Sequence, residues 1–186
     1  FDRIVRDPIL QAIHTTFAGG PVFISASYFI EKVGLAPGGG LHNGGFPRIR
    51  SIYYDYDHTT QSFACSSTKS VVILSDMTYI ESGPFAAIPG SHRANFSCPF
   101  DMSDATKNPM CVPVFAAPGD VIIFSEGMTH NAYPVTDDSV RRSVFFNYMP
   151  AIGRNNLPDQ RMSIYPDHVL ERLSDQRSNL SSPGYI

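Results

Sequence analysis

Between residues 45 and 150 the chain has no helical periodicity, and this feature most limits the folds it can adopt. Its apolar runs there are short, are rich in β-branched and aromatic residues, and lie next to Gly, Pro, Asp or Ser. A parallel α/β fold does not fit, because it needs a helix between successive strands. The pattern instead predicts a β-sandwich or jelly roll with helices at its flanks.

The strands expected from this pattern are short, with Gly, Pro, Asp or Ser nearby. They cover residues 22–30, 49–56, 70–74, 85–88, 112–116, 121–124 and 143–148. A polar turn is expected at residues 57–61, and Pro118-Gly119-Asp120 predicts a second turn between two strands.

Helices are expected only near the ends of the chain. The first is predicted over residues 2–17, where Val5, Ile9, Ile13 and Phe17 recur at four-residue steps and so share one face. Pro8 lies inside this segment and suits the first turn of the helix proper. A second helix is predicted over residues 166–173, starting at a Pro-Asp pair.

Composition limits the class of protein. The chain has 186 residues and is 42% hydrophobic, enough for one domain with a core. Its net charge of −3 argues against a nucleic-acid partner, and no apolar run approaches the roughly 20 residues of a membrane span. Three cysteines without metal-type spacing (Cys65, Cys98 and Cys111) indicate reduced thiols and a cytoplasmic location.

Two of the six histidines stand out as candidate ligands. His42 lies in a glycine-dense loop, and His130 lies six residues past an expected strand. Arg141 and Arg142 lead into an apolar strand, where a buried arginine needs an anion as partner. The alternative is that both arginines reach solvent at the strand end. For the other histidines we expect structural or surface roles: a partly buried surface side chain at His14, a turn hydrogen bond at His92, and solvated side chains at His58 and His168.

Three stretches together resemble the phytanoyl-CoA dioxygenase family. They are Leu41-His42-Asn43-Gly44-Gly45, the run from Gly83 to Pro89-Gly90-Ser91-His92, and the run from Pro118-Gly119-Asp120 through Thr129-His130 to Arg141-Arg142. Their order and spacing match the family: His130 follows His42 by 88 positions, and Arg141 follows His130 by 11. The resemblance is clearest over residues 41–148. Family members are usually longer at the N-terminus, so we expect residues 1–186 to be a single oxygenase-like domain that lacks part of that region.

The resemblance implies a cupin-like double-stranded β-helix with flanking helices that binds Fe(II) and the co-substrate 2-oxoglutarate. It assigns the two metal-binding histidines to His42 and His130, and the arginine that pairs with the far carboxylate of 2-oxoglutarate to Arg141. Arg142 is the competing anchor, and strand alternation turns only one of the two inward. The implied activity is hydroxylation of a small organic substrate with O₂.

The sequence departs from the family at the third metal ligand. The usual motif is His-x-Asp, whereas this chain reads His42-Asn43-Gly44. Three explanations remain open. A His-Gly-Gly-like branch can complete the site with water or a remote carboxylate, with Asp55, Asp57 and Asp76 as candidates. Alternatively, Gly44 opens a position for a halide, as in related iron halogenases. The third explanation is a site that binds metal weakly or not at all, and a chain that has lost the metal would be a non-catalytic jelly-roll binding module.

The sequence does not identify the substrate. The segments expected to shape its pocket are residues 55–67 and 96–109, which are both polar. Neither carries a basic patch for the phosphates of a CoA thioester, since Lys107 is the only lysine after Lys69. We therefore expect a small molecule other than a CoA ester.

Overall fold

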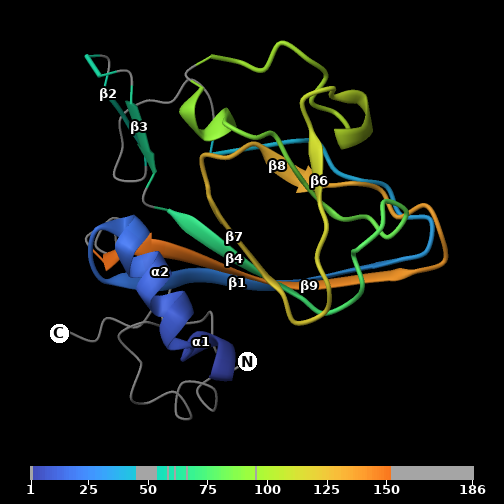
Figure 1. Cartoon of the computed structure of the whole chain (residues 1–186), viewed down its shortest axis with the longest axis horizontal. Helices are drawn as coiled ribbons and strands as arrows, with labels where there is room; N and C mark the ends of the chain where they lie inside the picture. Colours follow the sequence, from blue (N-terminus) through green and yellow to red (C-terminus); the bar gives the residue numbers. More distant parts are fainter. Residues whose placement is uncertain are drawn as a thin grey trace.

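The computed structural model describes residues 2–44, 54–57, 59–60, 62–65, 67–94 and 96–151, which form a jelly roll with helices on one outer face (Figure 1). The main sheet has the order β1 (Val22–Val33), β9 (Val140–Pro150), β4 (Thr68–Ile73), β7 (Val121–Ser125). The smaller sheet has the order β6 (Val112–Val114), β5 (Phe85–Ala87), β8 (His130–Ala132). A hairpin joins β2 (Tyr54–Asp57) to β3 (Ser62–Cys65), and η1 (Ser91–Arg93) and η2 (Ala105–Lys107) are single 3₁₀ turns. The predicted mainly β fold is confirmed.

The main sheet is buried on both faces. One face packs on the smaller sheet through a core that includes Phe85, Phe124 and Phe145. The other face packs on α1 (Asp2–Val5) and α2 (Pro8–Ala18) through a core that includes Phe146 and Tyr148. Because side chains alternate along a strand, the neighbours Phe145 and Phe146 belong to opposite cores.

Most predicted strands are confirmed to within a few residues. The strand predicted over residues 49–56 overlaps β2, and residues 49–53 lie outside the described part of the chain. The prediction missed β3 and β8, which are four and three residues long and contain no β-branched residue. The helix predicted over residues 166–173 lies outside the described residues. None of the described helices combines the length and apolar character that a membrane span requires.

The predicted N-terminal helix is divided into two. The Asp7 carboxylate accepts hydrogen bonds from the backbone N–H groups of Ile9 and Leu10, at 2.9 and 3.0 Å, and Pro8 occupies the first turn. The break changes the phase of the helix, so the predicted apolar face is wrong for α2. Ile9 and Phe17 are 68% and 61% exposed, and the buried side chains of α2 are those of Leu10 and His14.

His14 is fully buried between α2 and the main sheet, which corrects the expectation of a partly buried surface residue. Its Nδ1 lies 2.6 Å from Thr68 Oγ1, its Nε2 lies 2.6 Å from Ser70 Oγ, and its ring stacks on Tyr148. A neutral imidazole satisfies both hydroxyls, because each hydroxyl can donate or accept. Burial lowers the pKa of His14 from 6.5 to about 4.

This burial predicts a loss of stability in acid. Between pH 6.5 and about 4 the unfolded chain protonates His14 while the folded chain does not, so the free energy of unfolding falls as the pH falls. The contribution of His14 is roughly 3 kcal/mol across that window. Urea unfolding of the natural chain and of His14→Gln at pH 7 and near pH 4 isolates it, since other groups titrate alike in both proteins. Equal losses of stability in the two proteins would contradict the assignment.

Candidate functional site

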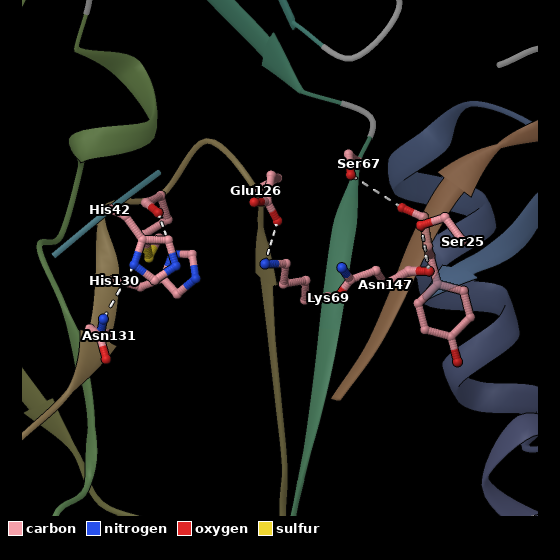
Figure 2. A network of polar contacts seen from close by, with 10 residues as sticks. Ser25, His42, Ser67, Lys69, Glu126, His130, Asn131 and Asn147 are labelled. Atoms are coloured by element: carbon pink, nitrogen blue, oxygen red, sulfur yellow. Dashed lines mark hydrogen bonds and ion pairs between the residues drawn. The ribbon is translucent and has the colours of Figure 1, made fainter. Parts of the chain in front are cut away.

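His42 and His130, the two predicted ligands, are joined directly through their backbones. The N–H of His42 donates to the carbonyl of His130 at 3.1 Å, and the N–H of His130 donates to that of His42 at 2.9 Å. The imidazole ring centroids lie 4.5 Å apart (Figure 2). Residues 88 positions apart in the sequence therefore present their rings side by side.

The His130 ring lies in an aromatic environment at the edge of the inter-sheet core. Its centroid is 4.5 Å from that of Phe124 and 5.8 Å from that of Phe85, and the residue is 3% exposed. Burial lowers the pKa of His130 to about 3. The hydrogen bond to Met128 O acts in the opposite direction but is the smaller effect. The ring is therefore neutral at physiological pH. With Nδ1–H donated to Met128 O at 2.7 Å, its Nε2 lone pair remains available to a metal.

The glycine-dense loop holds His42 against β8. A Cβ on Gly38 would lie 2.9 Å from the carbonyl oxygen of Ala132, and a Cβ on Gly39 would lie 2.5 Å from the side-chain amide of Asn131. Asn131 donates to Gly40 O at 2.6 Å, and His42 Nδ1 lies 3.1 Å from the same oxygen. In the tautomer that donates Nδ1–H to Gly40 O, Nε2 of His42 is also available as a ligand. These glycines thus permit a close approach of the loop to a strand.

The Pro-Gly-Ser-His turn, residues 89–92, is hydrogen-bonded to the segment that leads into β8. Ser91 Oγ accepts a hydrogen bond from the N–H of Thr129 at 2.8 Å, and Asn43 Nδ2 donates to Thr129 Oγ1 at 2.9 Å. Thr129 therefore links the turn, the His42 loop and the start of β8. His92 lies in η1 next to Ser91, whereas His58 and His168 lie outside the described residues.

Arg141 is the inward member of the arginine pair. It is 3% exposed, whereas Arg142 lies on the opposite face of β9, is exposed, and forms an ion pair with Glu31. This rules out the alternative that both arginines reach solvent at the strand end. Burial lowers the pKa of Arg141 to about 10, so its guanidinium remains charged at physiological pH. Its buried Nε has no hydrogen-bond partner among the described residues.

One small cavity, of about 90 Å³, brings the three predicted site residues together. His42, His130 and Arg141 all line it, with Tyr28 and Phe145 among its apolar walls. Lys32 also lines it, because β1 pairs with β9 in a register that sets Lys32 opposite Arg141. Burial and, second, the Arg141 charge lower the pKa of Lys32. The described lining includes two cationic side chains and no carboxylate, which suits an anionic ligand.

The described residues place no third ligand beside the two histidines. No group of three His, Cys, Asp or Glu side chains suitable for a metal occurs among them. Asp57 and Asp76 are exposed and accept hydrogen bonds within their own turns, and the side chain of Asp55 lies outside the described part. Glu126 lies at the end of β7, where its carbonyl accepts the N–H of Gly44. Its carboxylate pairs with buried Lys69 at 2.8 Å (Figure 2).

Sequence reasoning did not identify Lys32, Asn131, Lys69 or Glu126. Lys32 becomes part of the site only through the pairing of two strands that are far apart in sequence. Asn131 directly follows His130, and its adjacency to the predicted ligand was the only available signal. The Lys69–Glu126 pair requires the β4–β7 register, which no local pattern contains.

Comparison with known families gives one match. Residues 50–143, about half of the chain, match the family model described as phytanoyl-CoA dioxygenase (PhyH). The matched range includes His130 and Arg141, and His42 precedes it. A curated relative, dioxygenase lolE1 of Epichloe uncinata, is 28% identical over 145 residues, which cover 76% of this chain. The chain spans about half of that relative, 52% of its length.

Solved structures share the fold. HygX from Streptomyces hygroscopicus, crystallised with nickel and 2-oxoglutarate, superposes with a TM-score of 0.67 at 24% identity, over 81% of this chain and 65% of HygX. AviO1 from Streptomyces viridochromogenes Tue57 superposes with a TM-score of 0.55 at 22% identity, over 80% of this chain and 60% of AviO1. These similarities establish the jelly-roll fold.

The contact between the glycine loop and β8 predicts that Gly39→Ala destabilises the fold. Its Cβ would displace the Asn131 amide and break the hydrogen bond to Gly40 O, at a cost of about 1–3 kcal/mol. Gly20→Ala is the matched control, because a Cβ there meets no atom within 4 Å. Urea unfolding measures both variants. A Gly39→Ala chain as stable as the Gly20→Ala chain would contradict this account of the loop.

Proposed function

Because the chain belongs to the phytanoyl-CoA dioxygenase family, we propose that it is a non-heme iron, 2-oxoglutarate-dependent oxygenase that hydroxylates a small organic substrate. The observation that carries the proposal is the small cavity in which two imidazoles and a buried, incompletely paired guanidinium converge. HygX, which has the same fold, has been crystallised with iron and with nickel and 2-oxoglutarate.

His42 and His130 are the proposed metal ligands. Both rings have Nδ1 next to a backbone carbonyl oxygen, and in the tautomer that donates Nδ1–H to that oxygen each Nε2 is available to a metal. His130 is neutral because of its burial, so it need not lose a proton to bind a cation. Two imidazoles with open neighbouring positions suit Fe(II), which, when bound with 2-oxoglutarate, supplies the activation of O₂.

Arg141 and Lys32 are the proposed partners of 2-oxoglutarate. The guanidinium can bind a carboxylate through two parallel hydrogen bonds, and its unpaired Nε is one available donor. The Lys32 ammonium is held by the carbonyl oxygen of Pro37 at 2.5 Å and adds a second positive charge to the same cavity. The stacked rings of Tyr28 and Phe145 form part of the wall beside these charges, and Arg141 itself is 3% exposed, so its attraction for an anion is weakly screened.

An anaerobic titration with Fe(II) and 2-oxoglutarate tests this proposal. We expect the weak visible charge-transfer band of the iron–2-oxoacid complex in the natural chain. Arg141→Gln should weaken 2-oxoglutarate binding by roughly tenfold to a hundredfold, the effect of losing hydrogen bonds to a charged group. Lys32→Met should have a smaller effect. Arg142→Gln is the matched control, since Arg142 is exposed and pairs with Glu31 outside the cavity.

Two outcomes of this titration would contradict the proposal. Absence of the band at saturating iron and 2-oxoglutarate would favour a non-catalytic binding module. Equal effects of Arg141→Gln and Arg142→Gln would remove Arg141 from the 2-oxoglutarate site.

A halogenase is the second candidate, and one observation favours it. Gly44 occupies the position of the family's usual aspartate, and the described residues supply no carboxylate in its place. A position left open beside two imidazoles can accept a halide ion.

Chloride separates the two candidates without knowledge of the substrate. If the chain is a hydroxylase, chloride should leave the affinity for 2-oxoglutarate unchanged in the Fe(II)-loaded protein. If it is a halogenase, chloride should strengthen that binding, and Gly44→Asp, which restores a carboxylate, should abolish the effect. Titration of 2-oxoglutarate in chloride and in sulfate at equal ionic strength measures this difference. A chloride effect that persists in Gly44→Asp would contradict the halogenase assignment.

A further inference from the structure

We propose that a second, larger cavity binds the substrate, and that this substrate is an uncharged molecule with a mainly hydrocarbon surface. The inference rests on the proposed function, because it takes the neighbouring histidines as the reactive centre. The cavity has a volume of about 520 Å³, in the range of pockets for drug-sized ligands. His42 lines this cavity and the small cavity alike, so a molecule bound here reaches one proposed metal ligand.

The described lining of the larger cavity contains no Asp, Glu, Lys or Arg side chain. An ionic group that entered it would lose hydration without gaining a counter-ion, which is strongly unfavourable. The small cavity differs, since Lys32 and Arg141 line it. The small cavity is thus a cationic compartment, suited to a dicarboxylate, and the larger cavity is a neutral compartment. His42 lines both.

The described walls of the neutral compartment are mainly apolar. Leu41 and Ile88 are buried members of a hydrophobic core cluster, and Met102 packs against that cluster. At the rim, Phe96 is 67% exposed and Met110 is 46% exposed. Aromatic and methionine side chains exposed beside a cavity are typical of a site that covers an apolar ligand, and methionine adapts to irregular shapes. The segment expected to shape the substrate pocket, residues 96–109, contributes part of this wall.

Three polar side chains of the lining take part in hydrogen bonds within the protein. Ser91 accepts from the Thr129 N–H, and Asn43 donates to Thr129 Oγ1. These groups hold the His42 loop and the start of β8 together, and the rest of the described lining is mainly apolar. Recognition in this compartment therefore depends mainly on shape and burial of apolar surface. A CoA ester does not fit this environment, because its phosphates require cations that the described lining lacks.

A matched set of probes tests the charge selectivity of this cavity: decanamide, decanoate and decylammonium, which share one chain and differ in charge. Their binding to the full metal-free chain is measured by isothermal titration calorimetry. We expect decanamide to bind at least about tenfold more tightly than either ion. Met110→Lys should weaken decanamide binding by about tenfold, because it places a charge in the wall.

Leu74→Lys is the matched control, because it shows whether decanamide binds to exposed apolar side chains outside the cavity. Leu74 is also 46% exposed but does not line the cavity, so this variant should keep the natural affinity. An ion that binds as tightly as decanamide, no binding of any probe, or equal losses in Met110→Lys and Leu74→Lys would each overturn the inference. Failure of the proposed function is seen separately, as absence of 2-oxoglutarate binding in the Fe(II) titration, because the probe measurements use no metal.

Discussion

The two backbone hydrogen bonds between His42 and His130 are the contact on which the candidate site depends. They join a loop that follows β1 to the first residue of β8, so the orientation of each imidazole depends on the backbone of the other. The surrounding features all hold this contact in place. The glycines at 38 and 39 permit the approach of the loop, Asn131 bonds to Gly40, and Thr129 links the loop to the Pro-Gly-Ser-His turn. The conformation of the site is thus determined mainly by main-chain contacts.

The pairing of β1 with β9 places the two cations of the small cavity. It also sets the charged side chains of the two strands on opposite faces of the sheet. Lys32 and Arg141 are cross-strand neighbours that line the small cavity, and Glu31 and Arg142 are the next pair, on the opposite face. Glu31 and Arg142 neutralise each other as an ion pair, whereas Lys32 and Arg141 are both cationic. The same alternation in β9 sends Phe145 to the inter-sheet core and Phe146 to the core beneath the helices. A single register therefore determines both the packing of the main sheet and the charge of the cavity.

Local patterns in the sequence were sufficient for most of the strands and for the family. The resemblance identified His42, His130 and Arg141 as candidates, and the structure brings all three to one cavity, while their roles remain proposals. Reasoning from the sequence failed where long-range contacts decide the outcome. The His14 position looked like helix surface, but hydroxyls from β4 and the ring of Tyr148 enclose it. Likewise, Lys32 and the Lys69–Glu126 pair have no sequence signal, because the strand registers that position them are set by the whole sheet.

The charges around the histidines support the proposal that the site binds an anion. Lys69 lies near enough to His130 to contribute to the lowering of its pKa, but its charge is balanced by Glu126. Lys32 and Arg141 have no such partner in the lining of their cavity, and two like charges held close in a partly buried space repel each other. A dicarboxylate bound there, as proposed, would relieve this repulsion by pairing with both cations. The larger cavity, which His42 also lines, has no charged side chain in its described lining, so the substrate proposed for it would gain no ion pair there.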